Sequence, residues 1–141
     1  MKHENLTKLL ATSYVLYAKA QNYHWNVRGQ NFISVHKFLE EIYSSKPEII
    51  DEIAERIAQL GQKVSGTLKT YTEMSLISEG NKDLTMIEMM KDLVDSYKTV
   101  INFINKIIPE YQNDITTNDL LTRITVGYEK EKWLIESMIE A

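Results

Sequence analysis

Two histidines and three carboxylates in the first half of this 141-residue chain have the types and spacing for metal chemistry. They are His24, His36, Glu40, Asp51 and Glu55. His36 and Glu40 are four residues apart, as are Asp51 and Glu55, so each pair projects from one face of a helix. Imidazole and carboxylate donors suit iron, manganese or zinc, and two histidines with one carboxylate leave open positions on Fe(II). The sequence therefore contains a candidate redox-metal site.

Each of these residues also has a simpler interpretation. A histidine on an apolar helix face, such as His24, is more often a hydrogen-bonded core residue than a metal ligand. Carboxylates in helices are usually solvated or paired, as predicted for Glu52 and Arg56 at four-residue spacing. The five residues differ from this pattern because they lie where the predicted helices become apolar. A buried carboxylate is costly unless a cation accompanies it.

Four helices are predicted to position these residues, because apolar residues recur at three- and four-residue steps in four segments. The segments are 6–24, about 34–60, about 85–108 and about 120–138. Pro47 predicts a kink or break near 44–46, since proline lacks a backbone N–H and collides with the carbonyl of Tyr43. The polar stretch 62–82 is predicted to cross over, with a short helix around 72–76.

The expected fold class is all-α, with a single domain over residues 1–141. Four long helices with a long crossover and a short extra helix between the second and third have the plan of a ferritin-like four-helix bundle, a plan that other bundles share. Ordinary ferritins and di-iron bundles use Glu-x-x-His pairs. Here Gln21 and Ile33 stand three residues before the two histidines, so a metal site must lie elsewhere than in those proteins.

The spacing of the acids limits where a site can form. Glu40 and Asp51 are 11 residues apart on one predicted helix, a rise of about 16 Å. Two metal ions in a shared site lie only ~3.5–4 Å apart. Either the two acid pairs serve different places, or a second chain completes one site. An antiparallel two-fold pairing of the second helices would bring Asp51 and Glu55 opposite His36 and Glu40 of another subunit, with two identical sites per dimer.

Composition narrows the function classes. The chain has no cysteine, which excludes thiol chemistry and fits a reducing, cytoplasmic location. Residues 1–20 resemble a signal peptide only superficially, and no apolar run approaches the ~20 residues of a membrane span. The net charge is −4, and Lys2 and Lys8 are the only lysines before Tyr14. Tight phosphate binding needs several cations, so we expect weak or no DNA binding.

The stretch QNYHWNVRGQNFISVHKFLEEIY, followed by IIDEIAERIAQLG, resembles the Dps family, the mini-ferritins named as DNA-binding proteins from starved cells. GTLKTYTEMSLISEG and EKEKWLIESMIE extend the resemblance over most of the chain. The resemblance implies a hollow homododecamer that oxidises Fe(II), commonly with hydrogen peroxide and otherwise with O₂. Such a cage stores the ferric product and protects against oxidative stress.

The resemblance also implies the site. His24, His36 and Glu40 of one subunit and Asp51 and Glu55 of its neighbour would form ferroxidase centres at two-fold interfaces. Each centre would hold iron, up to two ions, with zinc or manganese as substitutes. Glu40 stands where many members have Asp, and Pro47 is unusual within the second helix. The alternative is therefore a cage-forming structural or DNA-associated protein with little ferroxidase activity.

Three further residues have two interpretations each. Asp114 and Asp119 resemble the acidic residues that line three-fold pores of such cages, and they equally fit the capping of the fourth helix. Trp25 resembles the family's tryptophan beside the site, which could intercept stray oxidising equivalents. Packing in the core or at an interface is its other interpretation.

Overall fold

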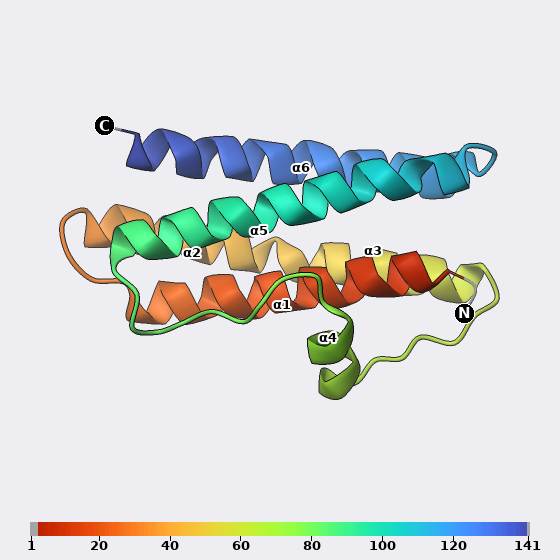
Figure 1. The fold of residues 1–141 in the computed structure, drawn as a ribbon, viewed down its shortest axis with the longest axis horizontal. Helices are drawn as coiled ribbons and strands as arrows, with labels where there is room; N and C mark the ends of the chain where they lie inside the picture. The colour runs from red at the N-terminus through yellow and green to blue at the C-terminus, as the bar shows by residue number, and fades with distance from the viewer. Residues whose placement is uncertain (1–2, 141) are drawn as a thin grey trace.

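A computed structural model describes residues 3–140, and within that range the fold is all-α with no strand. The α-helices are α1 (Glu4–Asn26), α2 (Phe32–Ser44), α3 (Lys46–Gln59), α4 (Leu68–Met74), α5 (Met86–Ile107) and α6 (Ile115–Ile139). A 3₁₀ turn, η1 (Ile108–Tyr111), lies between α5 and α6. In Figure 1, α1, the α2–α3 pair, α5 and α6 run side by side, and short α4 lies outside them against α1. This arrangement confirms the predicted ferritin-like bundle with a crossover.

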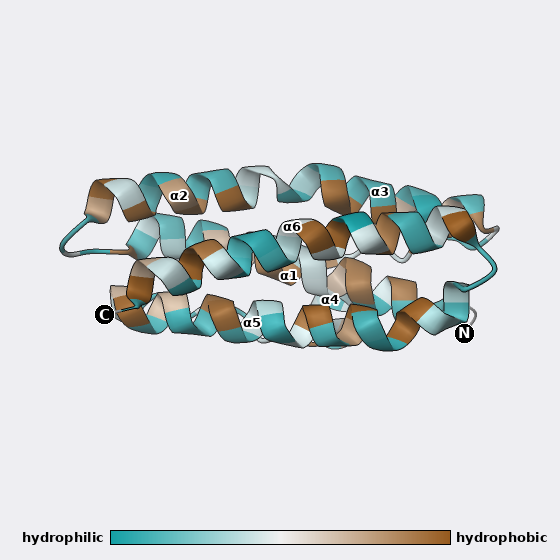
Figure 2. Cartoon of the chain, turned by 90° about the horizontal axis from the view of Figure 1, so that it is seen from above, coloured by the Kyte–Doolittle hydropathy of each residue, from teal (hydrophilic) through white to brown (hydrophobic). Residues whose placement is uncertain are grey.

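The second of the four rods of the bundle, which α2 and α3 form together, breaks where the sequence predicts a break. Ser45 alone separates α2 from α3 and keeps near-helical dihedral angles, φ −81° and ψ −14°. Pro47 lies in the first turn of α3, where its missing N–H would have no partner within the helix. The two helices therefore stay in line, as Figure 2 shows, and form one interrupted rod.

The crossover helix begins earlier than predicted. α4 starts at Leu68 and ends at Met74, whereas the sequence indicated residues 72–76. Thr67 sets this start, because its side chain accepts a hydrogen bond from the backbone N–H of Thr70. Tyr71 of α4 then stacks on Tyr14 of α1, with ring centroids 4.2 Å apart.

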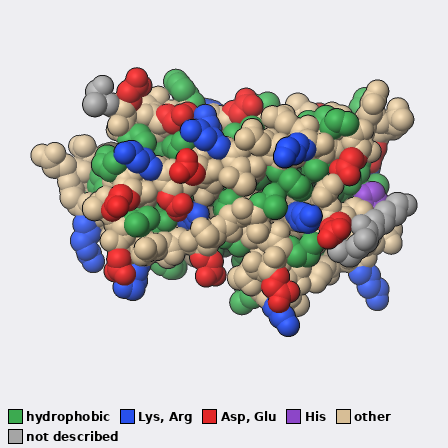
Figure 3. Space-filling view, viewed as in Figure 1, with side chains coloured by type: hydrophobic (Ala, Val, Ile, Leu, Met, Phe, Trp, Pro, Cys, Tyr) green, Lys and Arg blue, Asp and Glu red, His purple; other side chains and the backbone are tan. Residues whose placement is uncertain are grey.

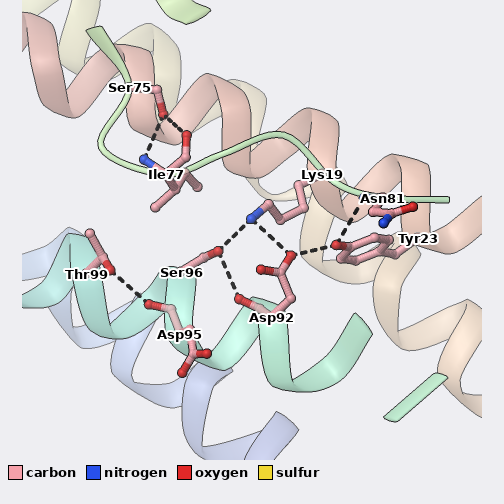
Figure 4. Close-up of polar contacts among 9 residues, drawn as sticks. All are labelled: Lys19, Tyr23, Ser75, Ile77, Asn81, Asp92, Asp95, Ser96 and Thr99. Carbon is pink, nitrogen blue, oxygen red and sulfur yellow. Dashed lines mark hydrogen bonds and ion pairs between the residues drawn. The ribbon is translucent and has the colours of Figure 1, made fainter. Parts of the chain in front are cut away.

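A buried polar network attaches the crossover to the bundle (Figure 4). Lys19 Nζ lies 3.0 Å from Asp92 Oδ2 and donates to Ser96 Oγ at 2.8 Å. The Tyr23 hydroxyl donates to the same carboxylate and accepts from the backbone N–H of Asn81 in the crossover. Burial and the Asp92 carboxylate raise the pKa of Tyr23, so its phenol stays protonated. The protonated Tyr23 hydroxyl thus links α1 both to α5 and to the crossover.

The apolar side chains of the rods meet along the axis of the bundle, where Leu9, Leu16, Leu39, Ile53, Leu93, Ile104 and Leu121 are fully or almost fully buried. Thr85 and Glu88 form a capping box at the start of α5.

Across residues 3–140, no helix combines the length and the apolar character needed to cross a membrane.

Candidate metal centre

The two candidate histidines lie against each other and hold each other in place. His24 is near the end of α1 and His36 is in the second turn of α2. His24 Nδ1 lies 2.7 Å from the carbonyl oxygen of His36, and His36 Nδ1 lies 2.7 Å from the carbonyl oxygen of His24. A carbonyl only accepts, so each Nδ1 donates its hydrogen, and in the neutral rings each Nε2 keeps a lone pair. A backbone carbonyl that accepts from Nδ1 leaves Nε2 as the nitrogen available to a metal ion, as is usual for metal-binding histidines.

The helix hairpin and two aromatic rings fix this pair. Gly29 and Asn31 adopt positive φ values of 116° and 65°, which turn the chain from α1 into α2. The two imidazoles stack with centroids 3.8 Å apart. Phe32 stacks on His36 at 5.0 Å, and Tyr43 presents its edge to His24 at 5.2 Å. These contacts thus set the positions of both imidazoles.

The three carboxylates lie on the exposed side of the interrupted rod. Glu40 is one turn after His36 on α2, and Asp51 and Glu55 are one turn apart on α3; all three are exposed. A hydrogen bond and charge repulsion from Asp51 raise the pKa of Glu55. A nearby cation would reduce this repulsion.

The structure brings the two histidines together but does not bring all five residues to one place. Within residues 3–140, no group of three or more His, Asp or Glu side chains is arranged to hold a single metal ion. Since α2 and α3 are in line, Asp51 and Glu55 stay far along the rod from the histidines. A site that uses all five residues needs donors from a second chain.

The pore candidates have partners within the chain. Asp114 caps α6, accepting from the Thr117 backbone N–H at 3.1 Å and from Arg56 Nη2 at 3.0 Å. The predicted Glu52–Arg56 pair is wrong, because Arg56 turns toward Asp114 while Glu52 pairs with Arg123 at 3.1 Å. Asp119 is exposed and pairs with Arg123 at 3.0 Å.

Asp114 should make the stability of the protein depend on acid pH. Hydrogen bonds from Thr117 and the Arg56 guanidinium lower the pKa of Asp114 to about 2, against a usual value of 3.8. Because the folded pKa is the lower one, the stabilisation is present above the unfolded value and is lost as the pH falls from about 4 to about 2. We expect Asp114→Asn to lower the melting temperature at neutral pH and to flatten its fall in this acid range. An Asp83→Asn control, at an exposed ion pair, should change neither.

Comparisons with known proteins show the family of the chain. The chain matches the model of the ferritin-like domain over residues 3–141. It is 36% identical over 138 residues to DNA protection during starvation protein 2 of Bacillus anthracis, covering 96% of this chain and 94% of that protein. The structure resembles Dps from Staphylococcus aureus with a TM-score of 0.93 at 29% identity, over 97% of this chain and 93% of the other. The chain belongs to the Dps family.

Another similar Dps structure carries a superfamily description of its own. Dps from Vibrio cholerae, described as a member of a broad superfamily of ferritin-like diiron-carboxylate proteins, has a TM-score of 0.91 at 28% identity. It covers 96% of this chain and 87% of its own. The chain is therefore a Dps-type mini-ferritin, and the histidine and carboxylate donors described above have the chemistry of iron ligands.

Two features of this Dps chain were not evident from its sequence. The spacing of His24 and His36 does not reveal that each ring binds the other's backbone carbonyl. The sequence did contain one indication of an aromatic ring beside the pair. Tyr43 comes seven residues after His36, which places it on the same helix face.

The prediction that Trp25 packs in the core of its own subunit is wrong, because Trp25 is 63% exposed in the single chain. An interface or redox role remains for this residue.

Proposed function

We propose that this Dps-family chain is a ferroxidase that oxidises Fe(II) with hydrogen peroxide and stores the ferric product in a homododecameric cage. The observation that supports the proposal most directly is the reciprocally bonded pair of His24 and His36. A core histidine needs one hydrogen bond to be satisfied, but it does not need a second imidazole stacked on it with both Nε2 atoms left free.

The proposed site forms between two subunits. One subunit supplies His24 from α1, and His36 and Glu40 from α2. A second subunit, related by a two-fold axis, supplies Asp51 and Glu55 from α3. The exposure of all three carboxylates in the single chain leaves them free for this contact. Two-fold symmetry then generates two identical sites per pair of subunits.

The chemistry assigned to this site consumes its oxidant without releasing radicals. Each of two Fe(II) ions gives one electron to a hydrogen peroxide molecule. The O–O bond breaks, and two protons complete two water molecules. The histidines and carboxylates bind and orient the Fe(II) substrate, and the repulsion between Asp51 and Glu55 is relieved when a cation binds. Zinc and manganese suit the same donors and should compete with iron.

An anaerobic titration tests the proposed function. Adding limiting peroxide to the Fe(II)-loaded protein should yield two Fe(III) per peroxide, measured by absorbance, with little hydroxyl radical detected by a spin trap. His36→Ala removes a ligand, so its rate should fall by more than the roughly 10–100-fold typical of losing an outer-shell partner. Lys37→Ala, at the neighbouring exposed position, is the control. Equal rates in wild type and His36→Ala would reject the site.

The alternative is a cage with little ferroxidase activity. It is favoured if light scattering shows a dodecamer while Fe(II) and peroxide react no faster than in buffer.

DNA binding has less support, because Lys/Arg and Asp/Glu side chains are interspersed on the face shown in Figure 3. A cytoplasmic location stays a prediction.

A further inference from the structure

A continuous series of aromatic rings extends from the histidine pair to the outer side of the bundle. His24 contacts Tyr43 with centroids 5.2 Å apart, and Tyr43 contacts Tyr17 at 6.1 Å. Tyr17 contacts Tyr14 at 5.9 Å, and Tyr14 stacks on Tyr71 of α4 at 4.2 Å with planes 16° apart. Each step is within the range of direct ring contact. Four tyrosines thus connect the candidate metal centre with the crossover.

We propose that Tyr43, Tyr17, Tyr14 and Tyr71 form a relay that removes stray oxidising equivalents from the metal site to the surface. The inference rests on the proposed function, because the site must generate the oxidant. Electron transfer weakens exponentially with distance, so short steps between touching rings are faster than one long step. The relay would spare His24 and His36 from oxidation.

The sequence places three members of the series on one face of one helix. Tyr14 and Tyr17 are three residues apart, and His24 follows Tyr17 by seven, so all three share a face of α1. Tyr43 fills the position between Tyr17 and His24 from α2, and Tyr71 covers Tyr14 from α4. The crossover is therefore an essential part of the proposed path.

The phenol hydroxyls of Tyr14, Tyr17 and Tyr43 differ from those of the other core tyrosines. Tyr23, Tyr97 and Tyr128 hydrogen-bond to Asp92, Glu131 and Ser13, respectively. The tyrosines of the relay are half-buried, and among the described residues no side-chain hydrogen bond holds the hydroxyls of Tyr14, Tyr17 or Tyr43. Phenylalanine would fill the same space at these positions, so packing alone does not require the hydroxyls.

The relay matters when a site holds only one Fe(II) ion. Peroxide then takes one electron from that ion, and its O–O bond breaks into hydroxide and a hydroxyl radical. The radical takes an electron and a proton from Tyr43 and becomes water. Tyr43 recovers its electron from Tyr17, Tyr17 from Tyr14, and Tyr14 from Tyr71, while protons exchange with water at the half-buried hydroxyls. The net loss is one electron and one phenolic proton from Tyr71, which becomes a neutral tyrosyl radical.

The outer end of the relay is open to solvent. Tyr14 and Tyr71 line a cavity of about 280 Å³ between α1, α4 and the crossover, together with Lys19, Asn22 and Gly80. The stacked rings of Tyr14 and Tyr71 can share the radical, which stabilises it at this end. A small reductant such as ascorbate could enter the cavity and return a hydrogen atom to the phenol.

The test compares wild type with Tyr17→Phe, which keeps the ring but removes the readily oxidised phenol. Each protein receives fewer Fe(II) ions than it has sites, and then peroxide, and is freeze-quenched. Wild type should show a tyrosyl radical by electron paramagnetic resonance and oxidised Tyr71 by peptide mass spectrometry. Tyr17→Phe should form Fe(III) at the same rate and keep its melting temperature. Its Tyr71 oxidation should be lost, and oxidation of Tyr43 and His24 should rise.

A matched control is Tyr111→Phe, since Tyr111 stacks on His3, outside the relay. It should behave as wild type. Equal Tyr71 oxidation in wild type and Tyr17→Phe would show that the radical arrives by diffusion and would overturn the relay alone. Normal Fe(III) formation with unmodified Tyr71 in wild type would do the same. Fe(III) formation in wild type no faster than in buffer would instead overturn the proposed function and the relay together.

Discussion

His36→Ala subunits and Glu55→Ala subunits, each inactive alone, are expected to oxidise Fe(II) after they are unfolded together and reassembled. The reason is the in-line arrangement of α2 and α3, which keeps the carboxylates of α3 away from the histidines of the same chain. In a mixed pair, one site lacks both His36 and Glu55. The other site receives its histidines from the Glu55→Ala subunit and its α3 carboxylates from the His36→Ala subunit, so it is intact.

Random assembly determines how much activity returns. Half of the two-fold pairs are mixed, and each mixed pair has one intact site of two, so about a quarter of all sites should be active. Stopped-flow measurement of Fe(III) formation with peroxide gives this fraction. Mixing His24→Ala with His36→Ala is the control, because both variants damage the same half of the site and should remain inactive. Failure of the first mixture to exceed this control would mean that one chain completes its own site.

Glu131→Ala is expected to lower the free energy of unfolding by about 3–5 kcal/mol, because it leaves a buried charge without its partner. Lys46, at the break between α2 and α3, is 0% exposed, and its Nζ lies 2.7 Å from Glu131 Oε2. The ammonium also faces the rings of Tyr97 and Tyr128, 5.8 Å and 5.2 Å from their centroids. Burial lowers the pKa of Lys46, and the Glu131 carboxylate opposes that shift.

Urea denaturation at a fixed protein concentration measures this effect, since self-association also contributes to apparent stability. The double variant Lys46→Met/Glu131→Leu should recover only part of the loss: a well-packed apolar pair often replaces a buried ion pair without cost, but the buried Tyr97 hydroxyl loses its acceptor. Lys132→Ala is the matched control: it breaks a 2.9 Å pair with Glu136 on the surface of α6, worth about 0.3–0.5 kcal/mol. A Glu131→Ala effect no larger than this control would contradict the assigned role of the pair.

The Lys46–Glu131 pair also shows how this bundle differs from one with a metal at its centre. Three different rods supply Lys46, Glu131 and Tyr97. The Lys46 ammonium and the Tyr97 hydroxyl both donate to the same oxygen of the Glu131 carboxylate. The interior of the subunit is thus occupied by a lysine–carboxylate pair. This agrees with the lack of Glu-x-x-His pairs in the sequence.

The sequence alone was sufficient to predict the long helices and the candidate metal-binding side chains. Apolar periodicity located the helices, Pro47 located the break at Ser45, and the four-residue spacings put each acid pair on one face. These features depend on contacts within one or two helical turns, which residue spacing reports directly. The rise along one helix also showed that Glu40 and Asp51 could not meet within one chain.

Only the tertiary structure decided which residues face one another across helices. It paired Arg56 with Asp114 instead of Glu52, and it placed Lys46 against Glu131, 85 residues away. It also bonded each histidine to the other's backbone and set Tyr71 on Tyr14. These contacts depend on how each helix is rotated about its axis and on how closely the helices pack. The periodicity of the sequence determines neither. The sequence determined which side chains could bind iron, and the packing determined which of them one subunit can bring together.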